Sequence, residues 1–173
     1  SSHPLPPESR RWNYAADIKY WMNRINEEMI DLNSLKNTSK QELHGLDDCY
    51  QLYRLHLVES KVVDFSSVQA ETLRIFLLHP TVLEELQSQV QYIMVDEYQD
   101  TNTSQYRLVQ QLVGDRGKLS VVGDDDQSIY SWRGANPENL VQLESDFKGL
   151  KVIKLEQNYR STNRILRAAN TLI

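Results

Sequence analysis

Apolar residues recur at helical spacing over the first third of the chain. From Trp12 onward they follow one another at steps of three and four residues: Ile18, Trp21, Met22, Ile25, Met29 and Leu32. This period predicts a helix with one buried stripe. Ser39 and Glu42 match a capping box, and the same spacing then continues through Leu43, Leu46, Tyr50, Tyr53 and Leu57. We therefore expect a second helix that forms a hairpin with the first.

After Lys61 the pattern changes to helices and short apolar runs. Asp64 is placed to cap a helix that runs through Leu78, where His79 and Pro80 end it, and Thr81 with Glu84 is placed to open another. Strands are then predicted over residues 92–95, 119–122 and 152–155, and helices over residues 103–113, 136–147 and from 162 onward. Such alternation predicts an α/β fold with a parallel sheet, which holds ligands at the carboxyl ends of its strands.

Composition bounds the class of protein. A chain of 173 residues with 40% hydrophobic content can bury a core. One cysteine, Cys49, excludes an internal disulfide framework, and the sequence holds no long uncharged run, so we expect a soluble cytoplasmic protein. The net charge of -5 gives no bulk attraction for nucleic acid, so DNA binding would need local stacking groups and a few placed cations. Residues 1–10 are proline-rich at their start and are expected to be a disordered tail.

Polar residues cluster after each predicted strand. Asp96 and Glu97 follow the first, residues 123–127 follow the second, and residues 157–160 follow the third. An acid on the rigid end of a buried strand is suited to hydrated Mg²⁺, which prefers one or two carboxylates together with phosphate oxygens. An isolated Asp-Glu pair is more often solvated or a helix cap, so the surrounding residues have to decide.

Three longer stretches resemble the motifs of a known enzyme family. Residues 95–101, Val-Asp-Glu-Tyr-Gln-Asp-Thr, resemble motif II, the Walker B region, of the superfamily 1 helicases of the UvrD, Rep and PcrA group. Residues 122–135 resemble motif III, and residues 155–161 resemble motif IV, in the family's order. Residues 64–68 are similar to an acidic segment upstream of motif II, with two acids replaced by serines. The amino-acid sequence of residues 100–106 favours the Rep branch of the family.

The resemblance implies a fold and an organisation. It implies part of a RecA-like, P-loop NTPase-type parallel sheet with flanking helices, preceded by an all-helical segment. Residues 11–63 would correspond to part of the helical domain 1B, and residues 64–173 to the C-terminal portion of motor domain 1A.

The resemblance also implies a function and its cofactors. The parent would be an ATP-dependent 3′ to 5′ helicase that uses ATP and Mg²⁺ to move along single-stranded DNA. Asp96 would hold the magnesium ion, and Glu97 would orient or deprotonate the attacking water and contact the metal through it. Gln127 would sense the γ-phosphate, Arg160 would stabilise phosphate charge and Tyr159 would stack on adenine.

The same resemblance implies a DNA contact. Tyr130 and Trp132 are two residues apart and would present their rings on one side of an extended segment to stack on bases, while Arg133 would contact a phosphate. A tryptophan is commonly a core residue, but the polar neighbours Ser131 and Arg133 count against burial here. Trp12 and Trp21 lie on the helical stripe instead and are expected to pack.

One element of an ATP site is missing from the sequence. The chain contains no Gly-x-x-x-x-Gly-Lys-Ser/Thr, and residues 114–119 have the wrong spacing for it. Motifs V and VI are also absent, so the chain is expected to be a fragment that is inactive alone and needs the remainder of a helicase polypeptide. A sheet that lacks its neighbouring strand would expose an edge and favour self-association.

Two alternatives remain open at this point. The chain could be a non-catalytic module that binds single-stranded DNA or regulates an intact helicase, and upstream coding sequence would separate that from an enzyme part. Asp96 and Glu97 could also form a nuclease metal pair, but such sites usually include a nearby lysine, and Lys118 opens its strand at the opposite end.

Overall fold

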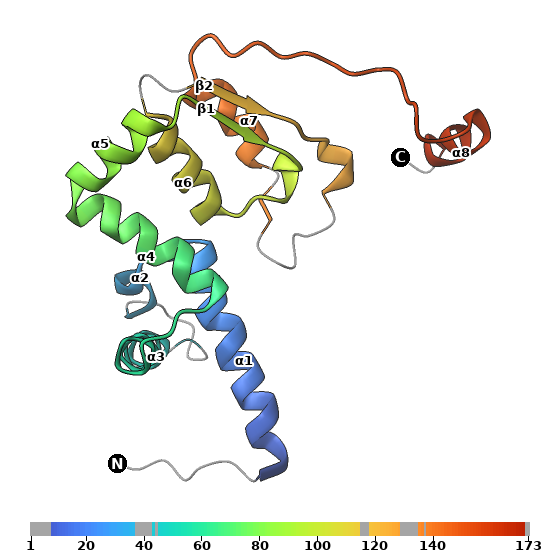
Figure 1. Ribbon diagram of the computed structural model, residues 1–173. Coiled ribbons are helices and arrows are strands. Elements are labelled where there is room, and N and C mark those ends of the chain that lie inside the picture. Colours follow the sequence, from blue (N-terminus) through green and yellow to red (C-terminus); the bar gives the residue numbers. More distant parts are fainter. Residues whose placement is uncertain are drawn as a thin grey trace. The chain divides into compact units, whose positions relative to one another are not determined.

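The computed structural model describes residues 8–36, 43, 45–114, 118–128, 135–136 and 138–171. The chain divides into two compact units, Ser1–Gln142 and Leu143–Ile173, and each is described by itself. Among the described residues the structure is mostly helical, with one small parallel sheet in the first unit (Figure 1).

The predicted first helix is divided by a tight turn. Helix α1 covers Glu8–Glu27 and helix α2 covers Leu32–Lys36, so the expectation of one helix through Leu32 is wrong. Met29 adopts a left-handed conformation with φ 53, and the Ile30 amide donates to the Ile25 carbonyl, a pattern that ends helices. Helix α1 also includes residues 8–10, which were assigned to the tail.

Helix α3 covers Leu46–Ser60 and packs against α1 and α2. It begins after Gly45, whose left-handed φ of 78 suits a residue without a side chain, so Leu43 lies before the helix and not in it. Ser39 and Glu42 lie outside the described residues. The buried cluster between these helices consists of Met22, Ile25, Leu35, Leu46 and Tyr50, so the predicted stripe is confirmed in part, whereas Met29 is 45% exposed. Trp21 packs against this cluster, as expected.

Helix α4, Phe65–Leu78, links the helical segment to the sheet. The Asp64 carboxylate accepts from the Ser67 amide at 2.6 Å, which confirms the predicted cap. Helix α5 covers Pro80–Gln89 and is capped by His79, two residues before the predicted cap Thr81, because proline at the first helical position has no amide donor to leave unsatisfied. Figure 1 shows α4 between the lower helices and the sheet, and it packs against α1, α5 and α6.

The sheet has two parallel strands. Strand β1 covers Tyr92–Val95 and strand β2 covers Lys118–Val121, in a register that pairs Tyr92 with Lys118 and Val95 with Val121. Helix α6, Thr103–Val113, follows β1 in the chain, packs against it, and ends at Gly114 as predicted. The predicted class, α/β with parallel pairing, is confirmed for this part of the chain.

The third predicted strand does not form. Residues 151–158 have no regular structure, and Val152 and Leu155 are exposed. An apolar run becomes a strand only when a neighbour satisfies its backbone donors and acceptors, which local sequence cannot reveal. The second unit contains the end of helix α7, Glu138–Asp146, and helix α8, Asn163–Ala169, which Thr162 precedes.

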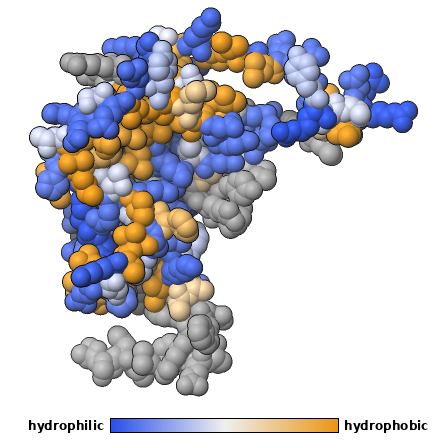
Figure 2. Space-filling model, in the orientation of Figure 1, coloured by the Kyte–Doolittle hydropathy of each residue, from blue (hydrophilic) through white to orange (hydrophobic). Residues whose placement is uncertain are grey.

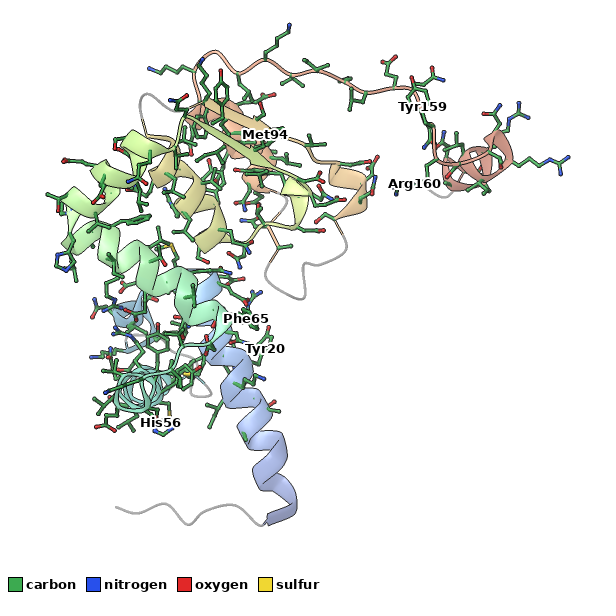
Figure 3. The ribbon with its side chains drawn as sticks, in the orientation of Figure 1. Tyr20, His56, Phe65, Met94, Tyr159 and Arg160 are labelled. Atoms are coloured by element: carbon green, nitrogen blue, oxygen red, sulfur yellow. The ribbon has the colours of Figure 1, made fainter. Side chains whose placement is uncertain are left out.

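Both strands present alternate residues to solvent. Tyr92 and Met94 of β1 are exposed, Met94 by 82%. Figure 2 shows apolar side chains over the strand pair, and Figure 3 shows Met94 on β1. On this face Lys118 Nζ lies 4.8 Å from the centre of the Tyr92 ring and donates to its hydroxyl at 2.9 Å, while Met94 is left largely open to solvent.

Candidate functional site

The turn after β1 holds the two acids of motif II. Both Asp96 and Glu97 are exposed, and Asp96 Oδ1 accepts from the Glu97 amide at 3.0 Å. Glu97 adopts a left-handed conformation, φ 48 and ψ 45. Such a conformation costs a non-glycine residue on the order of 1 kcal/mol and persists only where surrounding contacts hold it. The turn is therefore a constrained one that places two exposed carboxylates directly after the strand.

Backbone bonds extend the parallel ladder beyond the strands. The Val122 amide donates to the Val95 carbonyl at 2.9 Å, and the Tyr98 amide donates to the Val122 carbonyl at 2.9 Å. Tyr98 then begins the short 3₁₀ helix η2, Tyr98–Asp100, and its ring is fully buried edge-on to that of Tyr106, with centroids 6.4 Å apart. The motif II turn is thus fixed to the chain that leaves β2.

Gln99 connects the two turns through its side chain. Its Nε2 donates to Glu97 Oε2 at 2.7 Å, and its Oε1 accepts from the Asp124 amide at 3.0 Å. Gly123 allows this approach, because a Cβ there would lie 3.0 Å from Gln99 Oε1. The Gln99 side chain thus adds a second link to the backbone bonds that already join the two turns.

The second turn contains Gln127, in the 3₁₀ helix η3, Asp125–Gln127. Its Nε2 donates to Asp124 Oδ2 at 2.6 Å, and its amide donates to the Asp124 carbonyl at 3.0 Å. Asp124 Oδ1 accepts from the Asp126 amide at 3.1 Å. The exposed amide of Gln127 is thus held by Asp124 at the same edge of the sheet as Glu97.

A pocket of about 410 Å³ opens beside the motif II turn. Its lining comes from β1, the turn and the facing side of α6: Val95, Asp96, Glu97, Asp100, Thr101, Gln105, Leu108 and Val109. Asp100 Oδ1 is buried there with no hydrogen-bond partner among the described residues. The pocket therefore combines three carboxylates with an apolar wall.

These residues fit a magnesium ion that keeps ligands from elsewhere. The described residues contain no group of three or more His, Cys, Asp or Glu side chains close enough to hold a metal by themselves. Mg²⁺ is usually bound through one or two carboxylates, with waters and phosphate oxygens completing the shell. Asp96, with Asp100 nearby, offers that kind of partial ligand set.

The other predicted site residues are not placed in this pocket. Tyr130, Trp132 and Arg133 lie outside the described residues. Tyr159 and Arg160 belong to the second unit, where both are exposed, Tyr159 by 90%. Figure 3 shows both on the segment before α8, where Asn158 Oδ1 accepts from the amides of Arg160 and Ser161 at 2.9 Å each. Asp96 and Glu97 line one pocket, and Gln99 and Asp124 link Glu97 to Gln127, whereas the convergence of Arg160 with them stays a prediction.

Sequence reasoning did not single out Gln99 or Asp100. Both stand inside the motif II stretch, two and three residues after Glu97. A glutamine between two acids just after a strand was the available signal. Gln99 is 1% exposed, and its role as a bridge depends on the turn after the second strand, whose Asp124 amide donates to it.

Comparison with known proteins assigns the chain to a family. Residues 3–148 match the model of the UvrD/REP helicase N-terminal domain. The chain belongs to the UvrD/REP helicase family. This UvrD/REP chain is 58% identical over 125 residues to the ATP-dependent DNA helicase Rep of Escherichia coli K12, an alignment that covers 72% of the chain and 19% of that relative.

Two further relatives show the same relationship. The ATP-dependent DNA helicase PcrA of Bacillus subtilis is 51% identical over 128 residues, which is 74% of the chain and 17% of the relative. The DNA helicase II of Haemophilus influenzae is 38% identical over 169 residues, which is 98% of the chain and 22% of the relative. The UvrD/REP chain thus spans about a fifth of the length of these relatives. None of its described helices is long and apolar enough to cross a membrane.

Proposed function

We propose that this chain supplies the metal- and water-positioning part of an ATP-driven motor that moves on single-stranded DNA in the 3′ to 5′ direction. Asp96 and Glu97 leave the carboxyl end of a parallel strand and line one pocket, and Gln99 ties them to the turn of Gln127. That arrangement is the observation that carries the proposal. The names of the relatives, ATP-dependent DNA helicases, support the choice of ATP and DNA.

The roles follow from the chemistry of each group. Asp96 would hold Mg²⁺, which neutralises charge on the phosphates when bound, and Glu97 would position the attacking water. Gln127 would exchange its bond to Asp124 for one to the γ-phosphate, since an amide donates without fixing a charge. Arg160 and Tyr159 would contact phosphate and adenine, and Tyr130, Trp132 and Arg133 would hold DNA. The fold would be part of a RecA-like domain 1A, with residues 11–63 as part of domain 1B.

The 173-residue chain alone is proposed to hydrolyse no ATP at a motor's rate, because it has no glycine-rich phosphate loop. Activity is therefore tested in a chimera, in which the 125 residues of this chain that align with the Escherichia coli Rep helicase replace their counterparts there. We expect DNA-stimulated ATP hydrolysis from the chimera. Glu97→Gln should lower its kcat by about 100-fold or more with little change in KM, as expected for loss of a general base.

A matched variant separates chemistry from folding. Glu59→Gln changes an exposed glutamate at the end of α3, away from the pocket, and should leave kcat unchanged. Full activity of the Glu97→Gln chimera, or hydrolysis at a helicase rate by the 173-residue chain alone, contradicts the proposal.

A second candidate, to which the same 173 residues are equally suited, is a module that binds single-stranded DNA without hydrolysis. Fluorescence anisotropy of a labelled oligothymidine with the chain alone tests it, with Trp132→Ala as the variant. Binding that depends on Trp132, together with an inactive chimera, would favour the module over the motor.

Self-association through the strand pair is also proposed. Each strand of the two-stranded sheet has one edge that no described strand pairs, and Tyr92 and Met94 are exposed on the face of β1 beside it. Unpaired strand edges favour pairing between molecules. Sedimentation of the chain and of Met94→Lys tests this, because a lysine on that face should shift the equilibrium toward monomer.

A further inference from the structure

Gln99 is a buried side chain with two specific partners and no apolar role. It is 1% exposed, yet both ends of its amide are used, by Glu97 on one side and Asp124 on the other. Its own carbonyl also accepts from Ser128 Oγ at 3.4 Å. A buried polar side chain of this kind is retained at a cost unless all its bonds are made.

The direction of the two bonds explains why the residue is a glutamine. The Glu97 carboxylate accepts only, so its partner must donate, while the Asp124 amide donates only, so its partner must accept. A glutamine side chain meets both needs. Glutamate could serve Asp124 but would repel Glu97, and leucine of similar size could serve neither.

The bridge continues to the turn of Gln127. Asp124, whose amide Gln99 holds, accepts from Gln127 through its carboxylate. Four residues therefore form one chain of contacts, from Glu97 through Gln99 and Asp124 to Gln127. The chain joins the group that would position water to the group that would contact the γ-phosphate.

We propose that Gln99 is a positioning residue that couples the Glu97 carboxylate to the Asp124–Gln127 turn, so that movement of that turn is transmitted to Glu97. Its meaning for catalysis rests on the proposed function, whereas the coupling itself is a property of the folded chain. When Gln127 leaves Asp124 for a phosphate, Asp124 is free to shift, and Gln99 carries that shift to Glu97.

The coupling is tested by NMR spectroscopy on the 173-residue chain without nucleotide. Glu97→Ala changes an exposed side chain, so the fold should persist. We expect it to shift the side-chain amide signals of Gln99 and the backbone amide signal of Asp124. In a Gln99→Leu background the same Glu97→Ala change should lose most of its effect on Asp124.

Two substitutions at Gln99 test the direction of the bonds. Gln99→Leu removes the acceptor of the Asp124 amide, whose hydrogen exchange should accelerate about fivefold, the effect of one lost hydrogen bond. Gln99→Glu keeps that acceptor, so the exchange of Asp124 should stay within about twofold of the parent, while the donor to Glu97 is lost. A role in packing alone would not separate the two variants in this way.

A matched control removes a hydrogen bond between another glutamine and glutamate, away from the candidate site. Gln89 Nε2 donates to Glu85 Oε1 at 3.5 Å on the exposed side of α5, so Gln89→Leu should leave the Asp124 signal and its exchange unchanged. Circular dichroism checks that each variant is folded. If a Gln99 variant fails to fold, the Glu97→Ala shifts at Gln99 and Asp124 still decide, and an unmoved Asp124 overturns the proposal.

An equal Asp124 shift in both backgrounds also overturns it. Because none of these measurements uses ATP, they stand apart from the chimera's activity. An inactive chimera with intact coupling contradicts the proposed function, and an active chimera without coupling contradicts the role of Gln99.

Discussion

The side-chain amide of Asn139 donates a hydrogen bond to the backbone carbonyl of Thr101 at 2.9 Å, and the two residues are 38 positions apart in the sequence. The same amide lies 3.2 Å from Thr101 Oγ1, and the Asn136 amide donates to the same carbonyl at 3.0 Å. These bonds fasten the start of α7 to the residue that follows η2. Thr101 lines the pocket, so the start of α7 stabilises one of the residues that form the candidate site.

Replacing Asn139 should destabilise the chain. Asn139→Leu removes a donor that is 2% exposed and leaves Thr101 Oγ1 without it, so the free energy of unfolding should fall by about 1 to 3 kcal/mol. Urea unfolding followed by circular dichroism measures it. Val141→Ala, an exposed position on the same helix, should change stability by less than about 0.5 kcal/mol. Equal effects of the two variants would contradict the role of Asn139.

Stability should fall in alkali because of Tyr50. Burial is the largest cause that raises the pKa of Tyr50 above its ordinary value of 10.0, and its hydroxyl donates to Asn26 Oδ1. The unfolded chain therefore releases this proton first, so the contribution of Tyr50 is fully present below pH 10.0 and is lost as the pH rises through the higher folded pKa.

Urea titrations at several pH values from 8 to 11.5 measure this loss. Tyr50→Phe should be less stable than the parent at pH 8, by about 1 kcal/mol, because Asn26 loses a buried donor. Above pH 10.0 the difference in free energy of unfolding between Tyr50→Phe and the parent should become smaller. A gap that stays constant across the range would show that Tyr50 does not titrate as described.

Gln69 should stabilise the first turn of α6. Its Oε1 accepts from Ser104 Oγ at 2.6 Å and from Asn102 Nδ2 at 3.2 Å, and both partners are buried. Gln69→Leu leaves these donors without their acceptor on α4. We expect hydrogen exchange of the Gln105 and Tyr106 amides to accelerate by about fivefold or more.

A second contact between helices provides the comparison. Gln87 on α5 donates to the Gln111 carbonyl at 2.6 Å in an exposed setting. Gln87→Leu should leave exchange in the first turn of α6 unchanged, because solvent replaces an exposed partner. Acceleration of that turn by both variants would point to loosening of the whole helix.

Gly123 should tolerate no side chain. A Cβ there would meet Gln99 Oε1 at 3.0 Å, and Tyr98 Cβ and the Gln99 amide nitrogen at 3.4 Å. Gly123→Ala should lower the free energy of unfolding by about 1 to 3 kcal/mol and accelerate exchange of the Asp124 amide. Val122→Ala, at an exposed neighbouring position, is the control. If Gly123→Ala leaves the free energy of unfolding unchanged, the close approach of the two turns does not contribute to stability.

Local elements were largely predictable because their signals are local. Asp64 caps α4 as predicted, and the limits of α6 at Thr103 and Val113 were predicted correctly, since caps and a terminal glycine act within a few residues. The break at Met29 was missed, because a left-handed methionine leaves no mark in the hydrophobic period. The strand expected at Val152 failed because an apolar run does not report whether a partner strand lies beside it.

The sequence by itself determined the family, the acids after β1 and the parallel pairing. Motifs and the alternation of strand and helix patterns depend only on residues that are close to one another in the chain. Only the tertiary structure decided that Gln99 joins Glu97 to Asp124, that Asp100 lines the same pocket, and that Asn139 supports Thr101. Those contacts join residues from different elements. A hydrogen bond depends on position within a fraction of an ångström, which the packing of strands and helices sets and the order of residues does not state.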